Sequence, residues 1–381
     1  MRTVHPSIVI GSYGWDQDRV PRDEFQIRTQ ALDAVMDANG WKAILIYGDA
    51  AEHSALAYFS NFTPRLRWSM ALLPRAGEPR LLVSMSPRDL PAMRLMTWIA
   101  DVQSGWNWPS AFDPWLAKLD AEGPSDIGTV GFDMMRPTLF RSLQTSLGNR
   151  FRLHEADATV GACRTPRPRT LSLTRGAVTV MSTAADAFVK AWRDGDGAEK
   201  AALAGERTAR FLAAQDVRTL ASSDGGRTFA PFSGRFAAKG DRLAGYIAVK
   251  HMGYWADTFM SSTRHGSDVD RRVQASLDGM LHAIGPGIAA AALHAKAIEG
   301  LGSHSLHAVL SGSIGARIGL SLDEGGRLTA DASHVLAPGE VYSLHVGAYD
   351  PACGGGFASA MVAATASGHE LLYRSPSRAD A

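Results

Sequence analysis

The sequence predicts an α+β protein in two domains, and three observations lead to this prediction. Helical and strand patterns alternate over residues 1–165, as they do in an α/β domain. The segment Cys163–Thr170 then carries two prolines and three arginines, a composition that continues neither a helix nor a central strand. Two long helical patterns follow this linker, and residues 171–381 mix paired strands with further helices.

The first domain is predicted from short periodic segments. Apolar residues recur at helical spacing over Asp23–Asn39, and Gly40 then ends the pattern. Two apolar runs on either side of a turn that contains Gly77 predict a hairpin. The predicted strands are Ala43–Tyr47, Trp68–Leu73, Arg80–Ser84 and Thr129–Phe132, and the further helices are Pro87–Ile99 and Pro137–Leu147.

The second domain begins with helices and then becomes rich in strands. Pro286 suits the first turn of a helix, because proline lacks only an N–H that has no partner at this position. The predicted helices are Leu171–Trp192, Ala198–Ala214, Val269–Ile284 and Pro286–Leu301. The predicted strands are Leu243–Val249, Gly253–Met260, Ala316–Leu322, Val341–Val346 and Ala358–Thr365.

Charge and cysteine content exclude several classes of protein. Lys plus Arg number 39 and Asp plus Glu number 38, so the chain lacks the excess positive charge that nucleic acids and anionic membranes require. Cys163 and Cys353 are too few for a disulfide scaffold or a thiolate zinc site. Met1–Asp16 has no leader-like apolar run and no segment is long enough to span a bilayer, so we expect a cytoplasmic protein.

Common catalytic motifs do not occur in the chain. There is no Gly-x-Ser-x-Gly nucleophile motif, no phosphate-binding Walker loop and no His-Glu-x-x-His zinc motif. The function must therefore be inferred from a set of weaker motifs and from their order.

That order resembles the pita-bread superfamily, which includes methionine aminopeptidase, Xaa-Pro aminopeptidase, prolidase and creatinase. The matching motifs follow one another as Gly240-Asp241, Gly253-Tyr254-x-x-Asp257, Ile318-Gly319-Leu320-x-x-x-Glu324, Leu336-x-Pro338-Gly339-x-Val341 and Gly355-Gly356 with Thr365-x-x-Gly368-x-Glu370. The first half resembles the creatinase/prolidase N-terminal domain. The resemblance covers nearly the whole chain and implies a creatinase-type α/β domain before a pita-bread domain.

The metal-dependent members bind two divalent ions through two Asp, one His and two Glu, and the resemblance assigns each ligand a position here. Those positions hold, in chain order, Tyr246, Asp257, Ala316, His345 and Ser359. Asp257 is the one ligand that is kept. We therefore expect no metal and no other cofactor in this pocket.

Creatinase is the relative that works without metal, and Gly315–Glu324 resembles its corresponding segment. The resemblance implies a His as general acid/base, placed before the Gly240-Asp241 motif. Thr228–Lys239 contains no His, so creatinase chemistry on a guanidine is not expected in the same form.

The pocket that the resemblance implies still contains groups for proton transfer. An imidazole beside a carboxylate is a general acid/base near neutral pH, which makes His345 and Asp257 the predicted catalytic pair. Tyr246 is predicted to stabilise an oxyanion. The predicted substrate-binding residues are Arg65, Arg67, His251, Arg317, Asp323, Glu324 and Ser359. The alternative for the His–Asp pair is a satisfied buried hydrogen bond without catalysis.

The resemblance also implies a homodimer, in which the loop carrying Arg65 and Arg67 reaches the pocket of the neighbouring subunit. A guanidinium there could bind a substrate carboxylate. Trp106 and Trp108 lie on a Gly- and Pro-containing loop, and we expect them at a subunit interface.

Three hypotheses for function remain open from the sequence. The first is a metal-independent creatinase-like enzyme that hydrolyses or eliminates at a C–N bond of a small amino-acid-like or amide substrate. The second is a pita-bread binding protein without catalysis. The third is a metallopeptidase of the Xaa-Pro aminopeptidase or prolidase type, which requires a different alignment of the ligand positions.

Overall fold

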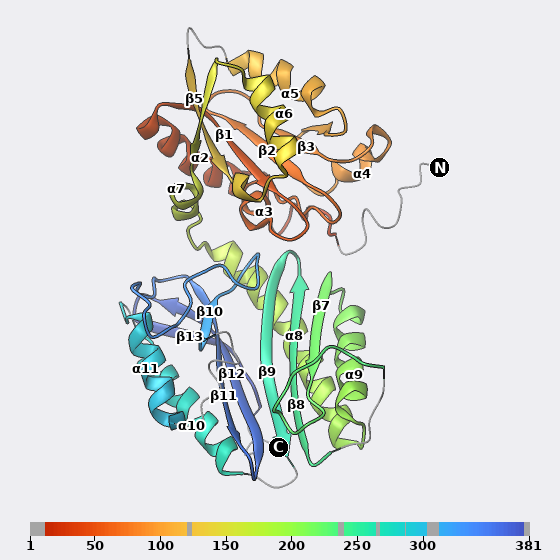
Figure 1. Ribbon diagram of the computed structural model, residues 1–381, viewed down its shortest axis with the longest axis vertical. Helices are drawn as coiled ribbons and strands as arrows, with labels where there is room; N and C mark the ends of the chain where they lie inside the picture. The colour runs from red at the N-terminus through yellow and green to blue at the C-terminus, as the bar shows by residue number, and fades with distance from the viewer. Residues whose placement is uncertain are drawn as a thin grey trace. The chain divides into compact units, whose positions relative to one another are not determined.

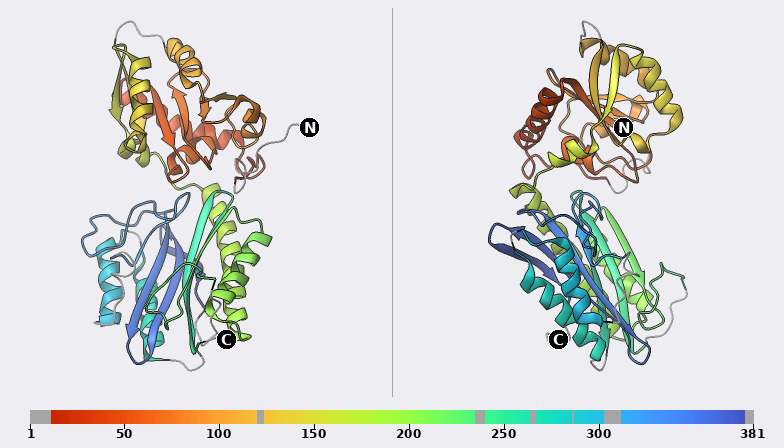
Figure 2. Two further views of the ribbon diagram at one scale, coloured as in Figure 1. Left: turned by 45° about the vertical axis from the view of Figure 1, so that its right-hand side comes forward. Right: turned by 60° about the vertical axis from the view of Figure 1, so that its left-hand side comes forward.

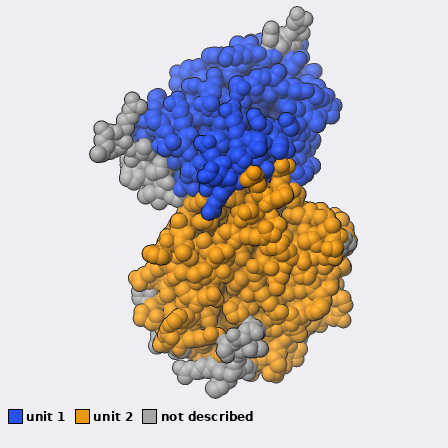
Figure 3. Space-filling view, turned by 180° about the vertical axis from the view of Figure 1, so that it is seen from behind, with its two compact units in different colours: residues 1–165 blue, residues 166–381 orange. Residues whose placement is uncertain are grey.

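The computed structural model describes residues 12–119, 124–234, 240–263, 267–285, 287–302 and 312–376. The chain divides into two compact units, Met1–Thr165 and Pro166–Ala381, which Figure 3 colours separately. We describe each unit by itself.

Unit 1 is a six-stranded sheet with helices on both faces. The sheet order is β4-β3-β2-β1-β5-β6, and β1 pairs antiparallel with β2 and parallel with β5. The strands are β1 (Trp41–Gly48), β2 (Ser69–Pro74), β3 (Arg80–Val83), β4 (Asp101–Ser104), β5 (Ser125–Val130) and β6 (Phe151–Glu155). The helices are α2 (Arg22–Asn39), α3 (Ser54–Ser60), α4 (Leu90–Met93), α5 (Trp108–Leu116), α6 (Pro137–Leu147) and α7 (Asp157–Ala162).

The predicted helix at Asp23–Asn39 is confirmed as α2, and Gly40 ends it with a left-handed φ of 68°. The predicted helix Pro87–Ile99 is wrong, because only a short 3₁₀ turn (Pro87–Asp89) and α4 form there. The chain after α4 is instead held in place by its side chains. Trp98 is buried and donates its indole N–H to the carbonyl of Phe59, at 2.8 Å.

The tryptophan loop divides between surface and core. Trp108 begins α5 and is buried against Phe112 in the core of unit 1, with ring centroids 5.2 Å apart. The expectation that Trp108 lies at a subunit interface is therefore wrong, because its side chain is buried in the core of unit 1. Trp106, in contrast, is 63% exposed.

Within the described ranges, unit 2 has two antiparallel sheets and the helices α8 to α11. Figures 1 and 2 show their arrangement. The first sheet has the order β7-β8-β9 and the second the order β10-β11-β12-β13. The strands are β7 (Asp216–Ala221), β8 (Arg242–His251), β9 (Tyr254–Thr263), β10 (Gly315–Arg317), β11 (Val341–Asp350), β12 (Gly354–Thr365) and β13 (Gly368–Arg374). The helices are α8 (Pro168–Arg193), α9 (Ala198–Phe211), α10 (Asp268–Ala283) and α11 (Ala290–Leu301).

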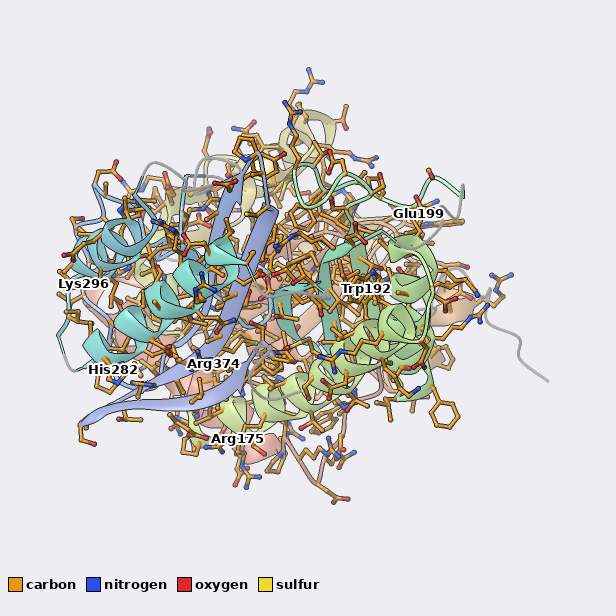
Figure 4. The ribbon with its side chains drawn as sticks, turned by 90° about the horizontal axis from the view of Figure 1, so that it is seen from below. Arg175, Trp192, Glu199, His282, Lys296 and Arg374 are labelled. Atoms are coloured by element: carbon orange, nitrogen blue, oxygen red, sulfur yellow. The ribbon has the colours of Figure 1, made fainter. Side chains whose placement is uncertain are left out.

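The four helices lie outside the two sheets. Helices α8 and α9 pack on β7–β9, while α10 and α11 pack on the other sheet. Figure 4 shows this arrangement from below. The labelled residues Trp192 and Glu199 lie on one side of the strands, and His282 and Lys296 lie on the other. Because β9 and β12 contact each other, the inner faces of the two sheets meet between the helices.

Three predictions for unit 2 need correction. The predicted strand Ala316–Leu322 ends at Arg317, because the next residues turn and the carbonyl of Gly319 accepts from Trp255 N–H at 2.7 Å. Helix α8 begins at Pro168, inside the predicted linker. Helix α11 begins at Ala290, and Pro286 lies outside the described residues. None of the helices in the described ranges is long and apolar enough to cross a membrane.

Candidate functional site

The first half of the site comes from the hairpin β8–β9. Asp257 lies directly opposite Ala248, and Tyr246 lies opposite Phe259. Residues two apart on a strand share a face, so Tyr246 and Asp257 point to the same side of the sheet. The Tyr246 hydroxyl donates to Asp257 Oδ2 at 2.9 Å.

The second half comes from the other sheet. His345 on β11 lies opposite Ser359 on β12, and Ser343 lies opposite Ala316 on β10. The period of two again places these side chains on one face. Four of the five positions assigned from the resemblance therefore gather with Ser343, and Ala316 belongs to the same face.

Hydrogen bonds and one ion pair connect the two halves. Ser343 Oγ donates to Asp257 Oδ1 at 2.5 Å, and His345 Nε2 lies 3.3 Å from Asp257 Oδ2. His345 Nε2 is 3.2 Å from Ser343 Oγ, and His345 Nδ1 is 3.0 Å from Ser359 Oγ. We refer to the five connected residues as the proton network: Tyr246, Asp257, Ser343, His345 and Ser359.

The donors of the network can be assigned from its geometry. The single protons of the Tyr246 and Ser343 hydroxyls both go to Asp257. Ser359 Oγ accepts from the backbone N–H of Phe259 at 2.9 Å, so its own proton is free to reach His345 Nδ1. Because a hydroxyl both donates and accepts, Ser359 supports His345 whether Nδ1 is protonated or not.

The same contacts shift two pKa values. Burial alone raises the pKa of Asp257, but the charge of His345 and the hydrogen bonds from Ser343 and Tyr246 outweigh burial and hold it below the usual range. Burial and the negative charge of Asp257 raise the pKa of Tyr246 well above its usual value, and the charge of Arg218 opposes this rise. Tyr246 is therefore a neutral donor beside an ionised Asp257.

A cavity of about 140 Å³ gives access to the network from one side. Ser343 and His345 line it, while Asp257 is 5% exposed and lies behind them. The other lining residues are Ser313, Gly315, Ala316, Leu322, Asp323 and Arg327. His345 is thus the titratable group of the network that a small molecule in this cavity can touch.

Aromatic rings cover another side of the imidazole. Phe259 contacts His345 edge-on with ring centroids 5.1 Å apart, and it also contacts Tyr246 at 4.6 Å. Phe229 and Phe357 continue this cluster. Sequence reasoning missed these rings and also Ser343, although the position of Ser343 two residues before His345 on a strand could have indicated it.

Three predicted substrate-binding residues have other roles. His251 lies an odd number of residues from Tyr246 and so points to the opposite face, where its ring approaches Gly176 of α8. Arg317 Nη1 pairs with Glu340 at 2.9 Å, and Glu324 Oε1 accepts from the backbone N–H of Leu320 at 2.8 Å. Arg317 and Glu324 therefore hold the loop after β10.

The other predictions stand differently. Asp323 lines the cavity and pairs with Arg327 at 2.5 Å, while Ser359 contacts His345 from behind. Arg65 and Arg67 belong to unit 1, where the Arg67 guanidinium lies 5.8 Å from the Trp106 ring. Tyr246 has no second proton for an oxyanion, so the predicted oxyanion role is replaced by the hydrogen bond to Asp257.

The donor set can be compared with what two divalent ions need. Hard divalent ions bind carboxylate oxygens, and a bridged pair needs several of them. The network supplies one carboxylate, one imidazole and three hydroxyls, and Ala316 supplies no donor atom. Within the described ranges no three or more His, Cys, Asp or Glu side chains cluster in a way that could hold a metal ion. The residues present do not fit a dinuclear centre.

Comparison with known proteins defines the family. The model of the metallopeptidase family M24 matches residues 181–366, and that of the creatinase/prolidase N-terminal domain matches residues 28–165. The chain belongs to the pita-bread M24 superfamily and carries the creatinase/prolidase N-terminal domain. No curated protein matches the chain.

Solved structures share the fold over nearly the full length. An X-Pro aminopeptidase from Thermotoga maritima MSB8 is 20% identical with a TM-score of 0.77, and covers 92% of this chain and 98% of its own. A prolidase from Pyrococcus horikoshii OT3 is 16% identical with a TM-score of 0.75 over 92% and 99%. The N-terminal domain of the FACT complex subunit SPT16 from Cicer arietinum is 12% identical with a TM-score of 0.65 over 92% and 96%. At these identities the likeness defines the fold alone.

Proposed function

We propose that the chain is a metal-independent hydrolase that acts on a C–N bond of a small amino-acid-like or amide substrate by general acid–base catalysis. The observation that carries the proposal is that His345 lines a cavity while its Nε2 lies 3.3 Å from the buried Asp257 carboxylate. A carboxylate beside an imidazole orients the ring and stabilises its protonated form.

The reaction follows from this pair. The Nε2–H of His345 points to Asp257, so Nδ1 is the nitrogen that accepts a proton. Nδ1 exchanges its contact with Ser359 Oγ for one with a water molecule and removes its proton, as the water oxygen bonds to the carbonyl carbon of the substrate. The resulting imidazolium faces Asp257 and then gives the proton to the leaving nitrogen, so that the C–N bond breaks and an acid and an amine leave. Tyr246, Ser343 and Ser359 act as positioning residues that hold Asp257 and His345. The same pair could serve an elimination, in which His345 removes a carbon-bound proton.

A non-catalytic binding protein is the second candidate, and one observation favours it. Each side chain of the proton network has a partner within the network, as a satisfied buried cluster does. The proposal further includes a homodimer and a cytoplasmic location. The exposed Leu66 and Trp106 of unit 1 support a subunit contact near Arg65 and Arg67.

The test is turnover by purified protein on a panel of N-acyl amino acids, simple amides and dipeptides that include Xaa-Pro, with release of the amine as readout. His345→Ala should reduce turnover about 10²- to 10⁴-fold without loss of fold. His282→Ala is the matched control. His282 is exposed on α10, and its described hydrogen bond joins Nδ1 to the carbonyl of Asp278 in the same helix. No turnover by the native chain would favour the binding protein, and equal turnover by the two variants would exclude His345 from the reaction.

A further inference from the structure

A second group of charged side chains lies on the same inner face as the proton network. Arg218 on β7 is directly opposite Ala248 on β8, which in turn is opposite Asp257 on β9. Directly paired residues of neighbouring strands point to the same side. Because adjacent strands are about 4.8 Å apart, the Cα atoms of Arg218 and Asp257 are separated by roughly 10 Å. Only the small side chain of Ala248 lies between them in this row.

Two cations of this group, Arg218 and Lys250, lie over the indole ring of Trp255. The Arg218 guanidinium lies 4.7 Å from the ring centroid of Trp255, and Lys250 Nζ lies 5.8 Å from the same ring. Trp255 is buried, whereas the Arg218 side chain is 61% exposed. A guanidinium stacked on an aromatic ring keeps its N–H edge available for a planar anion. Arg218 is therefore already oriented before any ligand arrives.

The carboxylate of Asp216 leaves positive charge at this edge of the sheet. Arg218 Nε lies 3.8 Å from one oxygen of Asp216 and Arg210 Nη2 lies 4.0 Å from the other. Lys250 is directly opposite Asp216 in the strand register. In the described ion pairs of this edge, Arg210 and Arg218 thus share one carboxylate. The charge of Arg218 also reaches the Tyr246 phenol, where it opposes the rise in pKa caused by burial and Asp257.

We propose that Arg218, stacked on Trp255 and assisted by the charge of Lys250, binds the carboxylate of a substrate whose C–N bond lies at His345. The inference rests on the proposed function for its second half. The inference narrows the substrate class to small molecules with a free carboxylate. It assigns recognition of that carboxylate to Arg218 on the inner face of the β7–β9 sheet. An amide or ester at the same position loses the charge-assisted hydrogen bonds.

The test compares two probes that differ only in charge, N-acetyl-L-alanine and N-acetyl-L-alaninamide, by isothermal titration at fixed pH and ionic strength. The native chain should bind the carboxylate probe about tenfold more tightly than the amide. Arg218→Gln should remove this preference, and Arg218→Lys should keep part of it. Arg271→Gln is the matched control, because Arg271 is an exposed residue of α10 paired with Asp268, and it should keep the full preference.

Several results would overturn the proposal. These are equal affinity of the native chain for both probes, no saturable binding of either, equal weakening of both probes by Arg218→Gln, or the same loss in Arg271→Gln. The His345→Ala variant separates this proposal from the catalytic one. It should lose turnover and keep the preference for the carboxylate probe, so that failure of one proposal leaves the other measurable.

Discussion

His345 and Asp257 belong to different sheets, and their side chains meet with Nε2 3.3 Å from Oδ2. The contact is buried on the carboxylate side, where Asp257 is 5% exposed, and open on the imidazole side, where His345 lines a cavity. Access for one partner and shielding for the other suit proton transfer, because the charge that stabilises the imidazolium is kept away from water.

Replacement of Asp257 by Asn should change how stability depends on pH. The pKa of Asp257 is lowered in the folded chain, since the charge of His345 and the donated hydrogen bonds outweigh burial. The ionised carboxylate therefore stabilises the fold above its usual pKa of about 4, and this contribution is lost as pH falls below that value toward the lowered pKa of the folded chain. Asp257→Asn should flatten the acid limb of the free energy of unfolding, measured by urea titration across that range. An unchanged acid limb would show that other carboxylates dominate it.

Replacement of Tyr246 by Phe should affect stability more than turnover. Its hydroxyl proton goes to Asp257, and loss of a donor to a buried carboxylate costs about 1–3 kcal/mol. Turnover should fall less than tenfold, because Asp257 keeps Ser343 and His345. A loss of turnover of about 10²-fold or more with unchanged stability would instead support an oxyanion role for Tyr246.

Replacement of Ser343 by Ala should destabilise the fold. Ser343 is buried and donates to Asp257 Oδ1, so its removal leaves that oxygen without this donor, at a cost of about 1–3 kcal/mol. Ser182→Ala on α8 is the control, because Ser182 is partly exposed and its described hydrogen bond goes to a carbonyl of its own helix. This control should change stability by less than about 0.5 kcal/mol. Equal unfolding curves for the two variants would contradict the assigned hydrogen bond.

Replacement of Arg317 by Ala should leave turnover unchanged. Arg317 pairs with Glu340 and donates to the carbonyl of Glu324, so it holds the loop after β10. Its side chain is 40% exposed, so solvent weakens the pair and the loss of stability should be about 1 kcal/mol. Thermal unfolding and turnover measured on the same preparation check this. A rise in KM without loss of stability would contradict this role and support the predicted role of Arg317 in substrate binding.

The fold could be predicted largely from ordered motifs and periodicity. The helix Asp23–Asn39 and the paired strands around Gly253-Tyr254 appear as predicted. The predicted helix Pro87–Ile99 was wrong because tertiary hydrogen bonds, such as that of Trp98, outweigh an apolar pattern. Strand β7, which carries Arg218, was not predicted. Half of its sequence DVRTLA is polar or charged, and most of its side chains are not fully buried.

The candidate site could be predicted where strand alternation and the resemblance agree. The resemblance placed Tyr246, Asp257, His345 and Ser359 at corresponding positions, and the contacts join these four. Strand alternation alone would have excluded His251, which lies at odd spacing from Tyr246. Arg317 and Glu324 could not be assigned from the sequence, because their partners depend on how the loop after β10 turns.

The central claim is that proton transfer at His345 needs no metal ion, and metal content tests it most directly. The chain would be purified without chelator or histidine tag and analysed by elemental mass spectrometry, before and after incubation with Mn²⁺ or Co²⁺. The account predicts near-zero metal per chain in both samples and turnover that a chelator does not change. One or two tightly held ions per chain, with chelator-sensitive turnover, would contradict it and restore the metallopeptidase hypothesis.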